Sequence, residues 1–245
     1  MNKVRIKKSF RVWAFRAIDE LELCKEYIEG HIKVLTDYGI TNITSNNNTW
    51  IENKYIYCVV VEDTETKELV GGIRIQIADG ISPLPVENAI GKIDAEIYNK
   101  VKFYALNGGV GELSGLWVSN KLKGVGMSTF LVRACVASSS QLNFQTMVGI
   151  CAGYSLKMFK DVGFYIDNSL GNNGDFPYPN DNYIANVVGI LNAATLETAK
   201  ELDKLKMFEL RNKPAQDRVE TNGNIDSHIF YNIIYNNISE IKYKL

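Results

Sequence analysis

The most constraining feature of this sequence is an apolar strand-like run joined to an apolar helix-like run by a turn that contains two glycines. ELSGLWV at 112–118 has the pattern of a strand, and MSTFLVRACVAS at 127–138 is apolar enough for a helix that packs on a sheet. Gly124 and Gly126 lie between them, where the backbone can approach a neighbouring group because no Cβ obstructs it. The sequence therefore predicts a strand, a turn and a helix in direct succession.

A helix that begins in such a turn is suited to bind a phosphate group. Its first N–H groups have no partner within the helix and carry a partial positive charge. Lys123 adds a full charge beside the turn, and Ser128 and Thr129 add hydroxyl donors. The Walker and dinucleotide-binding glycine patterns are both absent, so on spacing alone a tight turn without a ligand is the alternative interpretation.

The rest of the chain alternates between strand-like and helix-like periodicity. Strand patterns occur at 10–17, 55–62, 69–77, 112–118, 145–151 and 183–190, and helix patterns at 20–38, 87–105, 127–138, 155–161 and 195–211. Asp19 is the expected N-cap of the first helix, and Gly39 is its expected end. Hairpins mixed with β-α-β units predict an α/β fold with a mixed sheet and helices on both faces.

The length of the chain suits one main domain with an appendage. Its 245 residues are 46% hydrophobic, which is enough to bury a sizeable core. We expect the main domain at 1–192 and a helical and strand-like extension at 193–245 that packs on the same domain, with HIFYNIIY at 228–235 as its strand-like part. Two roles are open for the extension: it covers the sheet, or it forms a homodimer contact.

Charge and cysteine content exclude several classes of function. The 27 Lys and Arg residues nearly balance the 28 Asp and Glu residues, which argues against a nucleic-acid partner. Cys24, Cys58, Cys135 and Cys151 are widely spaced and there are only two histidines, so we expect neither a metal site nor disulfides. The sequence contains no run of about 18 apolar residues, so we expect no membrane span, and its basic start lacks the apolar stretch expected of a signal peptide. Reduced thiols indicate a cytoplasmic protein.

Two short motifs carry a resemblance to a known family. Lys123 to Ser128 follow an apolar strand that ends in Val118, and MFKDVGF at 158–164 has the pattern of a short helix that ends in Gly-Phe. With the order of the elements, they resemble the GCN5-related N-acetyltransferase (GNAT) superfamily over about 110–166. That family's pyrophosphate motif is Gln or Arg, two residues, Gly, one residue, then Gly or Ala. This chain departs from it with Lys at the first position and Ser at the last.

The resemblance implies a GNAT fold that binds acetyl-CoA, or another acyl-CoA, in a gap between two parallel strands, 112–118 and 145–151. Backbone groups of the first strand would pair with the pantetheine arm, and N–H groups from Val125 to Ser128 would hold the pyrophosphate. The expected donor-binding residues are Leu116, Trp117, Val118, Lys123, Gly124, Val125, Gly126, Met127, Ser128 and Thr129.

The chemistry implied is direct attack of an amine on the thioester, for which the protein supplies positioning, a base and donors for the thioester oxygen. Glu112 lies on the strand beside the expected gap and is the candidate base, with an exposed carboxylate as the alternative. Phe159 and Ala152 stand where the family often has Tyr and Asn, and Phe159 cannot protonate the leaving thiolate. Tyr154 is therefore the second candidate catalytic residue.

Other residues of this chain resemble a second branch of the same superfold. Arg74, and Glu112 with Ser114, match the Val-Gly-x-x-Arg-Leu and Glu-x-Ser-Arg patterns of acyl-homoserine lactone synthases and long-chain N-acyl amino acid synthases. Arg74 and Ser114 are thus candidate substrate-binding residues, although Gly115 replaces the arginine of the second pattern. Arg74 is otherwise a surface or cross-strand residue.

We therefore predict an acyl-CoA-dependent N-acyltransferase that acts on an amine of a small molecule or peptide, with acetyl-CoA as the first choice of donor. A synthase of the second branch and a non-catalytic acyl-CoA-binding module are the alternatives. The sequence leaves open the acceptor and the length of the acyl chain.

Overall fold

The computed structural model describes residues 6–39, 48–240 and 243–244. The strands are β1 (Ile6–Arg16), β2 (Ile56–Asp63), β3 (Leu69–Ile77), β4 (Val110–Val118), β5 (Thr146–Ala152), β6 (Tyr165–Ile166), β7 (Asp175–Pro177), β8 (Ile184–Ile190), β9 (Ala215–Asn222) and β10 (Ile225–Asn232). The helices are α1 (Leu21–Asp37), α2 (Pro85–Ile90), α3 (Glu96–Leu106), α4 (Met127–Ser138), α5 (Gly153–Asp161) and α6 (Glu201–Asn212). Short 3-10 turns lie at Ala17–Asp19, Thr49–Glu52 and Asn120–Leu122.

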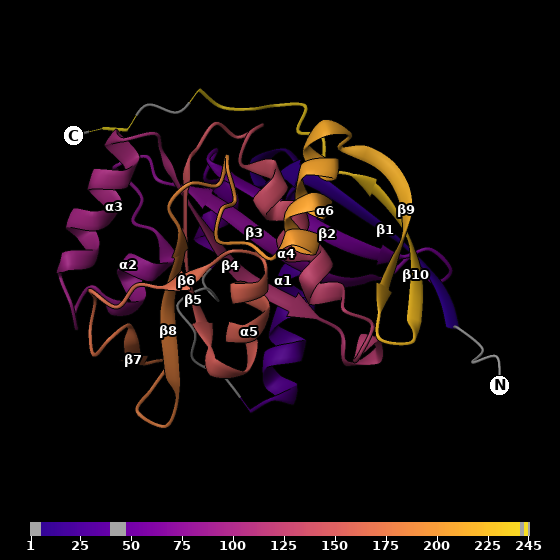
Figure 1. The fold of residues 1–245 in the computed structure, drawn as a ribbon, viewed down its shortest axis with the longest axis horizontal. Coiled ribbons are helices and arrows are strands. Elements are labelled where there is room, and N and C mark those ends of the chain that lie inside the picture. The colour runs from indigo at the N-terminus through magenta and orange to yellow at the C-terminus, as the bar shows by residue number, and fades with distance from the viewer. Residues whose placement is uncertain (1–5, 40–47, 241–242, 245) are drawn as a thin grey trace.

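The described strands form one mixed sheet in the order β6-β8-β5-β4-β3-β2-β1-β10-β9, with β7 paired to β8 (Figure 1). The strands from β1 to β4 pair antiparallel, whereas the β4–β5 and β1–β10 pairs are parallel. The apolar runs of β2 and β3 are buried on both faces, as expected of strands in the middle of a covered sheet. The predicted α/β fold with a mixed sheet is confirmed.

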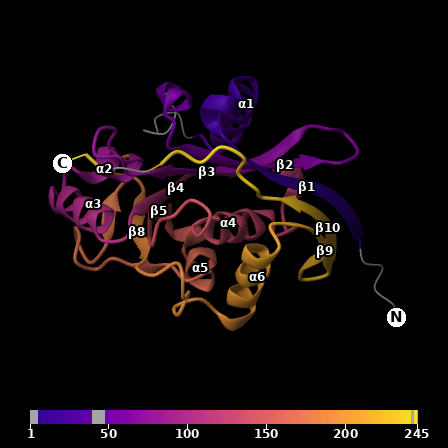
Figure 2. The ribbon, with the colours of Figure 1, turned by 90° about the horizontal axis from the view of Figure 1, so that it is seen from above.

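Helices cover both faces of the sheet (Figure 2). Figure 2 shows α1 on one side, and α4, α5 and α6 on the other. Alternation along β4 divides its side chains between the two layers, because successive residues point to opposite faces. Leu113 packs in the core beneath α4, whereas Val110 packs with α2 and α3. The residues of β4 that point away from α4 therefore face a separate, smaller apolar layer.

Three helix predictions need correction. Asp19 does not cap α1; its carboxylate accepts two hydrogen bonds from Arg16, at 2.7 and 2.9 Å, and Glu20 takes the N-cap position. The helix predicted at 87–105 is two helices, because the chain turns after Gly91 and Asp94 accepts the N–H of Glu96 at 3.0 Å.

The helix predicted at 195–211 begins only at Glu201. The residues before it are engaged elsewhere, because the Lys200 N–H donates to the Asp161 carbonyl at 3.0 Å and the Thr198 hydroxyl donates to the Gly163 carbonyl. These bonds fix the segment to the end of α5 in a non-helical path. These tertiary contacts therefore outweigh the helical pattern of residues 195–200.

The two strands of the extension continue the sheet, and its helix α6 lies beside α4 on one face. β10 pairs with β1 from Ile225 opposite Ile6 to Asn232 opposite Trp13, so the last strands lie beside the first. The sequence predicted a strand at 228–235 but missed the hairpin that β9 and β10 form. The division at residue 192 stays a prediction.

The tail after β10 runs along one end of the central strands (Figures 1 and 2). The Ser239 N–H donates to the Tyr57 hydroxyl at 3.0 Å, and the Lys244 N–H donates to the Asp79 carbonyl at 2.9 Å. The tail thus covers strand ends, while α6 of the same extension lies over one face of the sheet, which was one of the two roles left open for the extension. This end of the sheet lies opposite the glycine turn.

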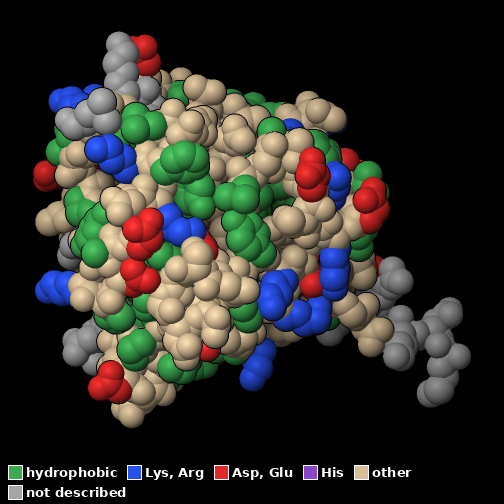
Figure 3. Space-filling model, turned by 60° about the vertical axis from the view of Figure 1, so that its left-hand side comes forward, with side chains coloured by type: hydrophobic (Ala, Val, Ile, Leu, Met, Phe, Trp, Pro, Cys, Tyr) green, Lys and Arg blue, Asp and Glu red, His purple; other side chains and the backbone are tan. Residues whose placement is uncertain are grey.

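Acidic and basic side chains are interspersed on the face shown in Figure 3, with exposed hydrophobic side chains among them. This mixture agrees with the small net charge of −1. None of the helices in the described parts of the chain has both the length and the apolar character needed to cross a bilayer.

Candidate active site

β4 and β5 separate soon after they begin to pair. Their parallel pairing runs only from Val110 opposite Thr146 to Glu112 opposite Val148. β4 continues to Val118 and β5 to Ala152 without further pairing between them. The unpaired edges of the two strands therefore form a gap that widens toward their C-terminal ends, as the resemblance implied.

The glycine turn, residues 123–126, lies at the wide end of this gap. Gly124 and Gly126 have φ angles of +83° and +86°, a conformation that only glycine adopts readily, and Gly126 is the N-cap of α4. The Val125 N–H already donates to the Leu122 carbonyl at 3.0 Å. The run of donors that we expected to begin at Val125 therefore begins at Gly126.

Three backbone donors at the start of α4 are available to a ligand. Among the described residues, none accepts a hydrogen bond from the N–H groups of Gly126, Met127 or Ser128. The side chain of Lys123 is exposed beside them, and Thr129 is half-buried one residue further along α4. N–H groups with a nearby ammonium group suit an anion.

Glu112 is enclosed at the narrow end of the gap. Its side chain is 0% exposed, and its Oε2 atom accepts the N–H of Val86 at 2.8 Å. Its Oε1 atom is buried and has no hydrogen-bond partner among the described residues. Burial raises the pKa of Glu112 to about 8; the Val86 N–H and the charge of Arg74 oppose this shift, and Glu87 adds to it. The alternative of an exposed carboxylate is wrong.

Arg74 is the buried cation next to Glu112 in the sheet. Its side chain is 3% exposed, its Nε donates to the Ser114 hydroxyl at 2.9 Å, and its guanidinium lies 4.7 Å from the centre of the Trp50 ring. None of the carboxylates in the described parts of the chain forms an ion pair with it. Arg74 is thus not a surface residue, but its bond to Ser114, the residue opposite it in β4, agrees with the alternative of a cross-strand residue. The two candidate substrate-binding residues do lie together.

A bulge in β4 sets the direction of the residues beyond Ser114. Gly115 has a φ angle of +62°, the register against β3 shifts at this point, and the hydroxyl of Tyr27 in α1 donates to the Gly115 carbonyl. Leu116 consequently packs toward α4, whereas the ring of Trp117 is buried against α1. The side chain of Trp117 is buried and that of Leu116 is half-buried, which leaves mainly their backbone to meet a donor.

The two aromatic residues at the start and middle of α5 have opposite surroundings. Tyr154, the second residue of α5, is 91% exposed at the C-terminal end of β5. Phe159, at the position of the family's tyrosine, is buried and packs edge-on against Phe164, with 5.2 Å between ring centres. Of these two residues, only Tyr154 has a proton to donate and access to a ligand.

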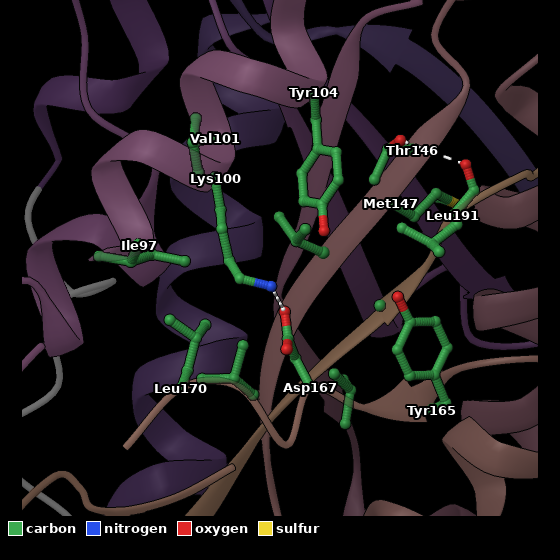
Figure 4. Close-up of a pocket in the computed structure, with 14 residues that line it drawn as sticks. Ile97, Lys100, Val101, Tyr104, Thr146, Met147, Tyr165, Asp167, Leu170 and Leu191 are labelled. Atoms are coloured by element: carbon green, nitrogen blue, oxygen red, sulfur yellow. Dashed lines mark hydrogen bonds and ion pairs between the residues drawn. The ribbon is translucent and has the colours of Figure 1, made fainter. Parts of the chain in front are cut away.

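A small hollow lies between α3 and the strands β5 and β8 (Figure 4). Lys100 points from α3 toward Asp167, and their Nζ and Oδ2 atoms are 2.5 Å apart. The ring of Tyr165 forms another wall, and burial raises the pKa of its hydroxyl to about 12. The space inside is about 10 Å³, enough for about one water molecule. None of the site residues predicted from the sequence lines this hollow.

Comparison with known proteins shows the fold. Neither a protein-family model nor a curated protein matches the chain. The structure is similar to that of FeeM, an N-acyl amino acid synthase from uncultured soil microbes, with a TM-score of 0.59, 13% identity, and 80% of this chain and 97% of that chain covered. The fold is that of the GNAT-type N-acyltransferases. The resemblance inferred from the two motifs therefore holds at the level of the fold.

Two further solved structures share this fold. The AHL synthase LasI is 15% identical with a TM-score of 0.55, over 82% of this chain and 96% of that chain. BjaI, a CoA-dependent acyl-homoserine lactone synthase with SAM and isopentyl-CoA, is 12% identical with a TM-score of 0.51, over 83% of this chain and 90% of that chain. Both likenesses concern the arrangement of the elements.

Two residues near the site were missed at the sequence level. Tyr27 supports the bulge of β4 from α1, and Asn222 donates from the β9–β10 hairpin to the Gly124 carbonyl at 2.7 Å. The role of Tyr27 could not be recognised from the sequence, because a tyrosine on the buried face of an amphipathic helix does not reveal which carbonyl its hydroxyl will contact. Gly223-Asn224, directly before the strand-like run that becomes β10, is a hairpin signal and could have predicted the turn beside Asn222.

Proposed function

We propose that this protein is an acyl-CoA-dependent N-acyltransferase that transfers an acetyl or longer acyl group to an amine, with Glu112 as the base. The observation that carries the proposal is the state of Glu112. It is a fully enclosed carboxyl group with a pKa of about 8 and one unpartnered oxygen, at the point where β4 and β5 separate. A base with a pKa near the working pH is efficient in general base catalysis.

The donor would lie along the gap between β4 and β5. N–H groups of Gly126, Met127 and Ser128 would bind its pyrophosphate, with Lys123 as a second source of positive charge. The backbone at Leu116 to Val118 would pair with the pantetheine arm, which would direct the thioester toward the narrow end of the gap. The carboxyl group of Glu112 lies at that end.

The acceptor nitrogen would attack the carbonyl carbon of the thioester and form the new C–N bond. Its proton would pass to the Oε1 atom of Glu112, directly or through one water, because the N–H of Val86 already holds Oε2. When the C–S bond breaks, the thiolate would take a proton from Tyr154 or from solvent. Tyr154 is therefore proposed as the acid and Glu112 as the base.

The direct test is acyl transfer by the purified protein. Acetyl-CoA and longer acyl-CoAs are incubated with a panel of amines and peptides, and the CoA thiol released is measured with a chromogenic disulfide. The proposal predicts amine-dependent release of CoA that Glu112→Gln removes while acyl-CoA still binds. If wild-type protein binds acyl-CoA but transfers no acyl group to any member of a broad panel, the binding-module alternative replaces the enzyme.

One observation favours an amino acid as the acceptor, as in the second branch. Arg74 is a buried cation without an ion-pair partner among the described residues, and it lies on the same face of the sheet as Glu112. A buried charge is costly unless it is paired, so a carboxylate on the acceptor would complete this site. FeeM, with the same fold, is an N-acyl amino acid synthase.

Arg74→Gln tests this second proposal. We expect about a tenfold or greater loss of kcat/KM for carboxylate-bearing amines, because a hydrogen bond to a charged group is lost. The value of kcat/KM for amines without a carboxylate should not change, and neither should the affinity for acyl-CoA. An equal loss for both classes of amine would contradict a carboxylate site at Arg74.

A further inference from the structure

The β9–β10 hairpin lies against the glycine turn, although the two are far apart in the sequence (Figure 1). Asn222, the last residue of β9, donates from Nδ2 to the carbonyl oxygen of Gly124 at 2.7 Å. A Cβ atom built on Gly126 would lie only 2.8 Å from the Cβ of Asn222. Ile225, at the start of β10, comes within 4.0 Å of the equivalent position on Gly124. The tip of the hairpin is therefore one wall of the turn.

The hydrogen bond from Asn222 fixes the direction of a carbonyl group that must point away from an anion. A turn binds an anion when its N–H groups converge on one side and its carbonyl oxygens lie on the other. The peptide between Gly124 and Val125 is held at both ends, because its N–H donates to the Leu122 carbonyl at 3.0 Å and its oxygen accepts from Asn222. The left-handed Gly124 has no Cβ that would restrict this peptide further. Asn222 holds the Gly124 oxygen on the side of the hairpin. Without the bond from Asn222, the Val125 N–H alone would hold this peptide, and its oxygen could tilt toward the anion and repel it.

The hairpin can serve as a fixed support because buried contacts tie it to α4. Arg133 in α4 pairs with Asp203 in α6, with Nε and Oδ1 2.8 Å apart, and with Glu220 in β9, with Nη1 and Oε2 3.3 Å apart. Gln141, beyond the other end of α4, donates to the carbonyl of Ile233 after β10 at 2.8 Å. The helix that would bind the pyrophosphate and the strand that carries Asn222 thus form one packed unit.

We propose that Asn222 is a positioning residue of the donor site, and that the C-terminal extension thereby takes part in binding the pyrophosphate of acyl-CoA. This inference rests on the proposed function, because it takes the glycine turn as the pyrophosphate site. Asn222 acts through the Gly124 peptide and does not itself contact the donor. The extension then contributes to the affinity for the donor.

The test is calorimetric titration of acetyl-CoA into the full-length wild type, Asn222→Ala and Asn222→Asp. Asn224→Ala is the matched control, because it removes an amide from the same hairpin tip outside the contact with the turn. We expect Asn222→Ala to raise the Kd for acetyl-CoA about five- to tenfold, the effect of one lost hydrogen bond. Asn222→Asp should raise it further, because a carboxylate cannot donate to the carbonyl and repels the anion. Asn224→Ala should leave it unchanged.

Two further readouts separate positioning from a general effect on folding. The thermal midpoint of ligand-free Asn222→Ala should match that of the wild type, and kcat at saturating acetyl-CoA should be unchanged while KM for the donor rises. If Asn222→Ala is destabilised, Asn222→Asp, which keeps the size of the side chain, decides the question.

The outcomes distinguish this inference from the proposed function. An unchanged Kd in both Asn222 variants, or an equal rise in Asn224→Ala, overturns the role of Asn222 and leaves the acyltransferase proposal standing. No binding of acetyl-CoA or longer acyl-CoAs to the wild type overturns the proposed donor itself, and the inference with it.

Discussion

Two buried glutamates in this molecule have opposite surroundings. Glu220 in β9 is 2% exposed, and its carboxylate is shared by Arg133, Arg218 and the hydroxyl of Tyr231. Glu112 in β4 is 0% exposed, yet it has one hydrogen bond, from a backbone N–H, and one oxygen without a partner among the described residues.

The difference shows that burial of a charge does not by itself mark a functional site. Buried carboxylates that are paired and hydrogen-bonded belong to the framework, whereas an enclosed carboxyl group that lacks partners carries a cost that a bound substrate can offset. By this criterion the network around Glu220 joins α4, α6 and β9 as part of the framework, whereas the surroundings of Glu112 and Arg74 have the character expected of the proposed site.

The largest expected effect separates the two glutamates by activity. Glu112→Gln should lower kcat/KM by about a thousandfold, within the usual range for loss of a general base. Glu220→Gln should leave kcat/KM per folded molecule near the wild-type value. Steady-state kinetics at a temperature where both variants are folded provide the comparison. A similar loss of kcat/KM in both variants would contradict the distinction between a catalytic Glu112 and a structural Glu220.

The second expected effect reverses the order of the two variants. Glu220→Gln should lower the free energy of unfolding by about 3 kcal/mol, because it leaves Arg133 and Arg218 buried without their shared anion. Urea unfolding at neutral pH measures this loss. Glu112→Gln should be no less stable than the wild type under the same conditions. A Glu220→Gln variant of wild-type stability would show that the network contributes little.

The third effect is a pH dependence of stability that arises from Glu112. The folded protein holds the proton of Glu112 with a pKa of about 8, against an ordinary value of 4.5. The contribution of Glu112 to the free energy of unfolding is therefore complete below about pH 4.5, and it is lost as the pH rises to about 8. Within this window it falls by up to about 1.4 kcal/mol per pH unit. The difference in unfolding free energy between wild type and Glu112→Gln, measured at several pH values, isolates it. A constant difference would mean that the pKa is ordinary.

The sequence predicted the central part of the fold better than its edges. The helix at 127–138 agrees residue for residue with α4, and the strand at 112–118 lies within β4, because strong local periodicity and the glycine turn mark both. The hairpin of β9 and β10 escaped notice because the burial of β9 alternates weakly, with mostly exposed residues. Its pairing with β1, which joins the two ends of the chain, leaves no local pattern.

The candidate site was likewise only partly predictable. Glu112, Arg74 and Ser114 could be selected from their spacing and resemblance, but their enclosure could not, because it depends on α2 and on Trp50. The use of the Val125 N–H within the turn also depends on the backbone geometry at Leu122. The contribution of Asn222 required knowledge of how the extension packs.

The most direct test of the account is the titration of Glu112 itself. Carbon NMR of the side-chain carboxyl groups in the ligand-free protein, with Glu112→Gln used to assign the signal, requires no knowledge of the acceptor. The account predicts a midpoint of about 8 for Glu112. A midpoint near the ordinary value of 4.5 would contradict the claim that this enclosed, incompletely bonded carboxyl group is the base of the site.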